Sequence, residues 1–242
     1  MRKINLFAAA IAATAFTAAA SGQVLINEID PNPPGGDPAV TSVELLGTPG
    51  ASFSGWVLSV ESDATTVGGV DRATEVSGTF DGDGLLLVTV PDFENPSFTV
   101  AVVGGFTGDT STDFDTDDDG VPDDISTVSS PFDAIGVPDA AGDEAFLYGE
   151  AFGGTDFTFT GDEPQLIFRD SIQGLLFAIN DPTNDEILFA GGGSFTAADF
   201  DADPFTSTFG SVNPGFTGVI PEPATLGLLS VAGLGLLRRR SA

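Results

Sequence analysis

Hydrophobic and polar residues alternate in short runs along most of the chain between residues 23 and 220. The clearest runs lie at residues 56–61, 98–102 and 156–160. A period of two in segments rich in Val, Phe and Thr is typical of half-buried β-strands. We expect the following large side chains to point inward: Trp56, Leu58, Phe98, Val100 and Phe157.

Between residues 23 and 220, turn residues separate the alternating runs, and no stretch keeps the 3.6-residue period of an amphipathic helix. Asp81-Gly82-Asp83-Gly84 and Gly191-Gly192-Gly193 are two of these breaks. Short strands between closely spaced turns predict an all-β, antiparallel β-sandwich. The length of this part favours one domain.

The first 20 residues have the features of an export signal. Arg2 and Lys3 precede an apolar, alanine-rich stretch that ends in Ala18-Ala19-Ala20. Small residues at that point suit signal peptidase, so residues 1–20 are predicted to be a signal peptide, with cleavage after Gly22 as the alternative. A buried N-terminal helix is the other interpretation.

The last 22 residues, 221–242, form a three-part pattern. Pro221, Glu222 and Pro223 come first, then an uncharged stretch over 224–237, then Arg238, Arg239 and Arg240. Fourteen helical residues rise about 21 Å, whereas a bilayer core is about 30 Å thick. The stretch is therefore a short transmembrane helix at best, and its arginines are expected on the cytoplasmic side.

This tail resembles the PEP-CTERM sorting signal of Gram-negative envelopes. The resemblance implies that an exosortase, a membrane cysteine protease, cuts near the Pro-Glu-Pro triplet and releases the rest of the chain outward. It also implies a protein that is exported, transiently anchored in the inner membrane, and then placed at the cell surface or outside the cell. A plain C-terminal anchor is the alternative.

The exported part carries a second resemblance. It opens with Val24-Leu25-Ile26-Asn27-Glu28-Ile29, continues with Ser42-Val43-Glu44-Leu45-Leu46, and closes with Thr206-Ser207-Thr208-Phe209-Gly210-Ser211-Val212-Asn213. These stretches are similar to the lamin tail domain, although Phe209 stands where that family usually has proline. The resemblance implies an immunoglobulin-like sandwich over residues 23–216, with long acidic loops or extra strands holding the surplus length. A generic jelly roll is the alternative.

The net charge and the residue types that the chain lacks limit the ligands and the catalytic groups that are possible. Of 36 acidic and seven basic residues, only Glu222 and five basic residues lie in the two end segments, which leaves 35 acids against Arg72 and Arg169, a net charge of −33. Such a surface repels nucleic acid and anionic lipid, so contact with a membrane is expected only through the tail. Without His or Cys, a Ser-His-Asp or Cys-His nucleophile is excluded.

One acidic stretch has the spacing of a cation-binding loop. Asp115, Asp117, Asp119, Val121 (through its carbonyl) and Asp123 are the predicted Ca²⁺ ligands, with Gly120 at the sharp turn. The spacing resembles EF-hand-like and thrombospondin type 3 loops, but Ser126 stands where the bidentate Glu is usual. A solvated acidic loop is the alternative, and the runs at 81–84 and 199–203 are weaker candidates.

Together these observations predict a non-catalytic surface or extracellular-matrix protein that binds calcium. Its partners would be signal peptidase and an exosortase during processing, and afterwards exopolysaccharide or other envelope components. An adhesion or carbohydrate-binding module is the first alternative. A carboxylate-dependent hydrolase is the second, because paired carboxylates are the only acid–base groups that the composition supplies in number.

Overall fold

The computed structural model describes residues 23–33, 35, 38–63, 67–93, 97–158, 163–180 and 182–220. The predicted signal peptide and sorting signal, including Pro221, Glu222, Pro223, Arg238, Arg239 and Arg240, lie outside these residues. Within them, no helix has both the length and the apolar character needed to cross a bilayer.

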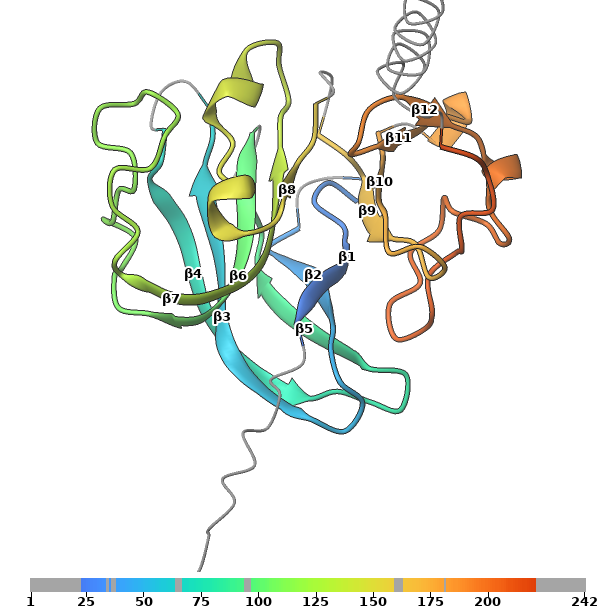
Figure 1. The fold of residues 1–242 in the computed structure, drawn as a ribbon, viewed down its shortest axis with the longest axis horizontal. Coiled ribbons are helices and arrows are strands. Elements are labelled where there is room, and N and C mark those ends of the chain that lie inside the picture. Colours follow the sequence, from blue (N-terminus) through green and yellow to red (C-terminus); the bar gives the residue numbers. More distant parts are fainter. Residues whose placement is uncertain are drawn as a thin grey trace, which may run out of the picture.

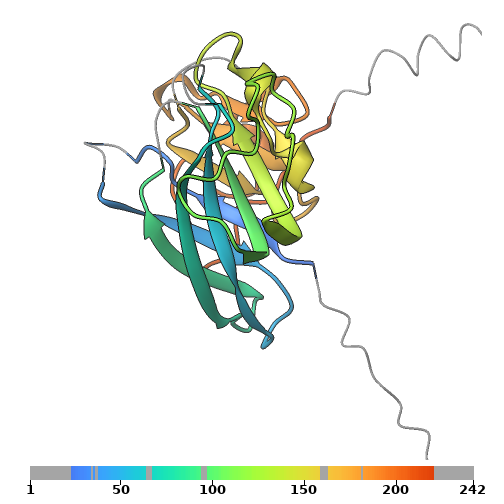
Figure 2. The same cartoon turned by 90° about the vertical axis from the view of Figure 1, so that its left-hand side faces the viewer.

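Strands in two sheets make up most of the regular structure (Figures 1 and 2). The strands are β1 (Leu25–Ile29), β2 (Val40–Leu46), β3 (Ser52–Glu61), β4 (Val70–Thr79), β5 (Leu85–Pro91), β6 (Phe98–Phe106), β7 (Val128–Val137), β8 (Thr155–Asp156), β9 (Leu166–Arg169), β10 (Leu176–Ile179), β11 (Ile187–Phe189) and β12 (Ser194–Phe195). Short 3₁₀ turns are η1 (Asp143–Phe146), η2 (Glu150–Phe152), η3 (Pro182–Asn184) and η4 (Ala197–Asp199).

The sheets have the orders β12-β11-β10-β9-β1-β2-β5 and β4-β3-β6-β7-β8. This arrangement confirms the all-β prediction. The sandwich is not purely antiparallel, because β7 and β8 pair in parallel. The strand predicted over 156–160 is shorter than expected, since β8 ends at Asp156, and residues 159–162 are not described.

The main core lies between the two sheets. Phe98, Val100 and Phe157 are fully buried in it, as the alternation predicts. Val57 on β3 is opposite Val102 on β6, and both belong to the same core. Burying side chains of this size contributes about 1.5–3 kcal/mol each.

A second cluster covers the opposite face of the five-stranded sheet. Leu58 and Trp56 belong there, with Phe114 and Tyr148 from the long connections that lie over the sheet. The prediction that placed Trp56 and Leu58 on the same inner face as Phe98 was therefore wrong, and Trp56 is only partly buried. Alternation cannot distinguish the two faces of β3, because both faces are covered.

A third cluster of aromatic side chains fills the lobe formed by β9–β12 and the chain that follows (Figure 1). Phe177 lies 5.0 Å from Phe200 and 5.1 Å from Phe216 between ring centroids. Phe195 packs edge-on against Phe216 at 4.7 Å. The strands β9–β12 thus have a core of their own beside the main core.

Candidate metal centre

The predicted ligands lie in the acidic loop, residues 107–127, which connects β6 to β7. The turn before β4 anchors this loop, because the Phe114 N–H donates to the Gly68 carbonyl (2.9 Å) and the Val70 N–H to the Thr112 carbonyl (2.8 Å). A Cβ on Gly68 would lie 2.6 Å from Cβ of Asp115. Glycine at position 68 therefore lets the two segments approach closely.

Asp115 is the buried centre of the loop. Its side chain is fully inaccessible, and its Oδ2 accepts hydrogen bonds from the Gly120 N–H (2.7 Å) and the Tyr148 hydroxyl (2.8 Å). The Asp119 N–H approaches Oδ1 at 3.2 Å. Burying a carboxylate is costly unless donors meet it, and these three donors do. The pKa of Tyr148 is raised, first by its own burial and then by the Asp115 carboxylate.

Three carboxylates converge at this point. Asp115, Asp117 and Asp123 each offer an oxygen within 4.8 Å of the others, with Asp115 buried and the other two exposed. The pKa of Asp117 is raised, chiefly by the charge of Asp119 and further by Asp123 and Asp115. Crowding of negatively charged carboxylates is the arrangement that a hard cation relieves. The group has the geometry to hold a metal ion.

Asp119 was also predicted as a ligand, but it does not belong to the group of three converging carboxylates. Its Oδ1 accepts the N–H of Val121, the fifth predicted ligand, at 2.9 Å. Asp123 also accepts both the N–H and the hydroxyl of Thr116 through Oδ2. Gly120 has a positive φ of 84°, and a Cβ there would lie 2.0 Å from the Ala145 carbonyl oxygen, so the turn predicted at this glycine is confirmed.

Tyr148 is the residue that sequence reasoning missed. It lies 33 residues from Asp115 along the chain, and its hydroxyl donates to that carboxylate inside the second cluster. The available signal was composition, because Tyr148 is the only tyrosine of the chain. A lone buried tyrosine needs a hydrogen-bond partner, and a protein so rich in acids offers many carboxylates as acceptors.

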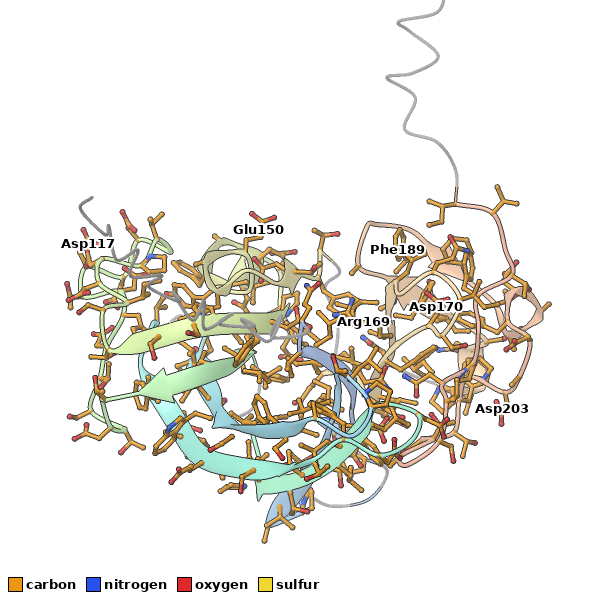
Figure 3. All side chains as sticks on the ribbon, turned by 60° about the horizontal axis from the view of Figure 1, so that its bottom comes forward. Asp117, Glu150, Arg169, Asp170, Phe189 and Asp203 are labelled. Carbon is orange, nitrogen blue, oxygen red and sulfur yellow. The ribbon has the colours of Figure 1, made fainter. Side chains whose placement is uncertain are left out.

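Aspartates of the two weaker acidic runs accept hydrogen bonds from backbone N–H groups. Asp81 accepts the N–H groups of Asp83 and Leu85 and so closes the hairpin between β4 and β5. Asp201 and Asp203 likewise accept N–H groups, from Gly215 and Phe205. Within the described residues neither run forms a metal-binding group. Figure 3 shows Asp117 and Asp203 at opposite ends of the molecule.

A separate polar network joins β1 and β2 to the C-terminal segment, defined as residues 205–216. Glu28 accepts the N–H (2.7 Å) and hydroxyl (2.8 Å) of Thr208, and Glu44 accepts the Gly210 N–H and the Asn27 amide. Burial raises the pKa of both glutamates, partly offset by these hydrogen bonds. Glu28 and Glu44 thus hold the C-terminal segment against β1 and β2.

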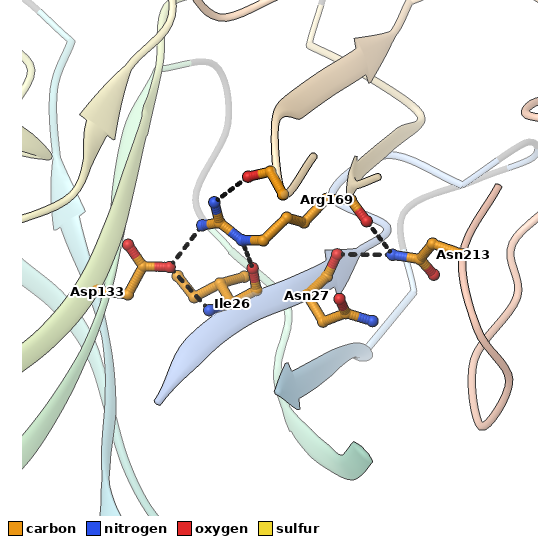
Figure 4. A network of polar contacts seen from close by, with 6 residues as sticks. Ile26, Asn27, Asp133, Arg169 and Asn213 are labelled. Carbon is orange, nitrogen blue, oxygen red and sulfur yellow. Dashed lines mark hydrogen bonds and ion pairs between the residues drawn. The ribbon is translucent and has the colours of Figure 1, made fainter. Parts of the chain in front are cut away.

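Arg169 is the cation of this region (Figure 4). Its guanidinium donates to Asp133 (2.8 Å) and to the carbonyls of Ile26 and Gly174. Burial raises the pKa of Asp133, while the charge of Arg169 lowers it. This ion pair joins the two sheets, because Arg169 is on β9 and Asp133 on β7.

Comparisons with protein-family models, with curated proteins and with solved structures found no match to this chain. Its function is therefore inferred from the sequence and from the geometry of its residues.

Proposed function

We propose that this protein is an exported, non-catalytic module of the cell surface or extracellular matrix whose acidic loop binds Ca²⁺. The main support for this proposal is that Asp115, Asp117 and Asp123 each offer a carboxylate oxygen within 4.8 Å of the others. Asp119, Val121 and solvent would complete the six to eight oxygen ligands that Ca²⁺ takes. Mg²⁺ suits the loop less, because it demands near-ideal octahedral geometry and loses water reluctantly.

Titration calorimetry of the folded protein tests this metal assignment. Extracellular modules bind Ca²⁺ with dissociation constants of roughly 10⁻⁴–10⁻³ M, and that range is expected here. Mg²⁺ should bind more weakly. If no saturable Ca²⁺ binding occurs up to about 10 mM, ten times the weak end of that range, the stretch is a solvated acidic loop.

Two deeply buried glutamates on β1 and β2 support a structural role for this chain. Glu28 and Glu44 are 1% and 0% exposed, and their oxygens are engaged by Thr208, Asn27 and Gly210. A general acid must reach its substrate, and these two carboxylates instead hold a segment of the chain. Release of reducing sugar from envelope polysaccharide, lost on mutating one Asp or Glu, would overturn the non-catalytic proposal.

The location is proposed from the two end segments, with the tail resemblance as its support. A signal peptidase would act near Ala20 and an exosortase near Pro221. Cells expressing the full chain and a version lacking residues 221–242 are fractionated, and the mature masses are compared. The full chain should pass through the inner membrane and lose its tail. Identical location and mature mass for both forms would contradict the sorting proposal.

Binding to exopolysaccharide is proposed by analogy with proteins that carry this kind of tail. A pull-down with envelope polysaccharide, with and without Ca²⁺, distinguishes a carbohydrate-binding module from a purely structural one. Retention on the polysaccharide would favour the binding module, and no retention in either condition would favour the structural role.

A further inference from the structure

A cleft of about 490 Å³ lies beside the acidic loop. One wall is formed by residues 120–122 of that loop, and the other walls come from η1, η2, β8 and the two residues after β8. Two of these walls touch, because a Cβ on Gly120 would lie 2.0 Å from the Ala145 carbonyl oxygen. The cleft therefore forms where the acidic loop packs against the chain that follows β7.

The charged groups of the cleft are all hydrogen-bond acceptors. Glu144 on η1, Glu150 on η2 and Asp156 on β8 line it, and none of the described lining residues is basic. Figure 3 shows Glu150 pointing outward from its turn. Burial raises the pKa of Asp156, and the charge of Glu150 adds to the rise, so these two carboxylates are neighbours. A ligand of this cleft must therefore bring donors, and an anion is disfavoured.

Asp156 is held in a fixed position by two backbone donors. Its Oδ1 accepts the Gly149 N–H at 2.7 Å, and its Oδ2 accepts the Glu150 N–H at 3.2 Å. A Cβ on Gly136 would lie 2.0 Å from Oδ1, and a Cβ on Gly149 would lie 2.3 Å from it. Glycine at both positions thus leaves room for this carboxylate, which can accept further hydrogen bonds through its remaining lone pairs.

The rest of the cleft is apolar and open to solvent. Val121 is 64% exposed, and Ala145 and Ala151 are exposed as well. Because the three acceptors come from three separate elements, the donors of a ligand must be spread over its surface. A sugar ring meets both conditions, since hydroxyls surround its edge and its C–H groups form apolar faces. An ammonium group instead holds all its donors at one point.

The cleft and the candidate metal group share one segment of the acidic loop. Residues 120–122 lie between Asp117 and Asp123, and the Gly120 N–H donates to Asp115 Oδ2 at 2.7 Å. Without a cation the three carboxylates repel one another. A cation bound to them would hold both ends of the segment together and so fix the wall of the cleft that lies between these ends.

We propose that this cleft binds a neutral saccharide and that Ca²⁺ on the acidic loop strengthens the binding. An apolar face of the sugar would lie on Val121 and Ala151, and its hydroxyls would donate to the carboxylates of Glu144, Glu150 and Asp156. This inference rests on the proposed Ca²⁺ site and adds the class of ligand that the site controls. Linked sites affect each other equally, so the saccharide should raise the affinity for Ca²⁺ by the same factor as Ca²⁺ raises that for the saccharide.

NMR titration of the intact protein with neutral trisaccharides tests the cleft. The probes are cellotriose, maltotriose, mannotriose and triacetylchitotriose, each in about 10 mM Ca²⁺ and in EDTA. At least one should give saturable shifts at the backbone amides of Ala145, Glu150 and Ala151, with an affinity about fivefold or more weaker in EDTA. Millimolar affinity is expected, because hydrogen bonds in an open cleft replace hydrogen bonds to water. Saturation with spermidine but with none of the four would identify an amine site and overturn the proposal.

Three variants separate the cleft from the metal group. Glu150→Ala should weaken trisaccharide binding about fivefold and leave Ca²⁺ affinity unchanged, because Glu150 lies outside the converging group. Asp117→Asn should weaken Ca²⁺ binding and remove the difference between Ca²⁺ and EDTA. Glu75→Ala, which removes an exposed carboxylate on β4, is the matched control for Glu150→Ala and should change neither.

The outcomes distinguish this inference from the proposed function. If calorimetry shows Ca²⁺ binding but no trisaccharide saturates, or if the trisaccharide affinity is the same in EDTA, the inference is overturned and the metal assignment stands. Equal losses of trisaccharide binding in Glu150→Ala and Glu75→Ala would also overturn it. If Ca²⁺ itself does not bind, both the metal assignment and the inference fail.

Discussion

Asp115 in the acidic loop and Glu44 in β2 are both fully buried carboxylates, but their surroundings differ. Around Asp115, two further carboxylates converge within 4.8 Å, and Asp117 and Asp123 remain exposed. Around Glu44, uncharged donors from Asn27 and Gly210 occupy both oxygens. The loop therefore gathers three carboxylates, two of them exposed to solvent, whereas Glu44 is held by uncharged donors.

This difference shows that burial alone does not mark a ligand site. A buried carboxylate that uncharged donors engage, and on which no exposed carboxylate converges, stabilises the fold. One that shares its position with exposed carboxylates has a reason to bind a cation. Asp133 is a third case, because Arg169 supplies the opposite charge from within the chain.

The largest expected effect comes from removing that cation. Arg169→Met leaves Asp133, which is 4% exposed, without its partner. Breaking a buried ion pair costs about 3–5 kcal/mol, so the free energy of unfolding should fall by that amount in urea titrations at pH 7. Arg72→Met is the control, because the pair of Arg72 with Asp71 is much more exposed and is worth about 0–1 kcal/mol. Equal losses in both variants would contradict the distinction.

Removal of the Tyr148 hydroxyl is expected to cause the second largest loss of stability. Tyr148→Phe removes the donor to Asp115 Oδ2 inside the second cluster while keeping the ring. A buried acceptor that loses a partner costs about 1–3 kcal/mol, measured as a drop in the free energy of unfolding. Thr116→Val removes an equivalent hydroxyl from the exposed Asp123 and should cost less than about 0.5 kcal/mol. A loss in Thr116→Val as large as that in Tyr148→Phe would refute the role of burial.

Calcium should stabilise the loop region by a similar or smaller amount. At ten times its dissociation constant, a ligand that binds only the folded state adds about 1.4 kcal/mol. We expect Ca²⁺ to raise the melting temperature and to protect the chain around Gly120 from proteolysis. Changing Asp117 and Asp119 together to Asn should abolish both effects. Changing Asp81 and Asp83 together to Asn should leave them intact, because that hairpin is not part of the converging group.

The sequence predicted the strands, the turns and the acidic loop, because each has a local signature. Alternation identified β3 and β6, but it could not show that β3 is covered on both faces, since the covering residues Phe114 and Tyr148 come from distant connections. The spacing from Asp115 to Asp123 identified the loop. It could not show that Asp119 would face the Val121 N–H, because backbone bonds within the loop decide that.

Substitution of Glu28 is expected to change the free energy of unfolding least. It also tests most directly how the carboxylates of β1 and β2 differ from those of the acidic loop. The Thr208 hydroxyl lies 2.8 Å from Glu28 Oε2 and 2.6 Å from Asn213 Oδ1. One hydroxyl hydrogen cannot serve both acceptors. The amide orientation of Asn213 is fixed, because its Nδ2 donates to the carbonyls of Asn27 and Arg169. A proton on Glu28 would supply the missing hydrogen.

The pKa of Glu28 supports this view, since burial raises it and Glu44 adds to the rise, although the Thr208 bonds lower it. A pKa raised in the folded state stabilises the protein fully below the ordinary Glu value of about 4.3, and this stabilisation is lost as pH rises through the folded pKa. Glu28→Gln, which carries its own hydrogens, should therefore change stability at pH 7 by less than about 1 kcal/mol, without the usual penalty for a buried substitution. It should also flatten the decline of stability above pH 4 in urea titrations, whereas Glu75→Gln should keep it. An unchanged slope in Glu28→Gln would mean that Glu28 stays ionised in the fold.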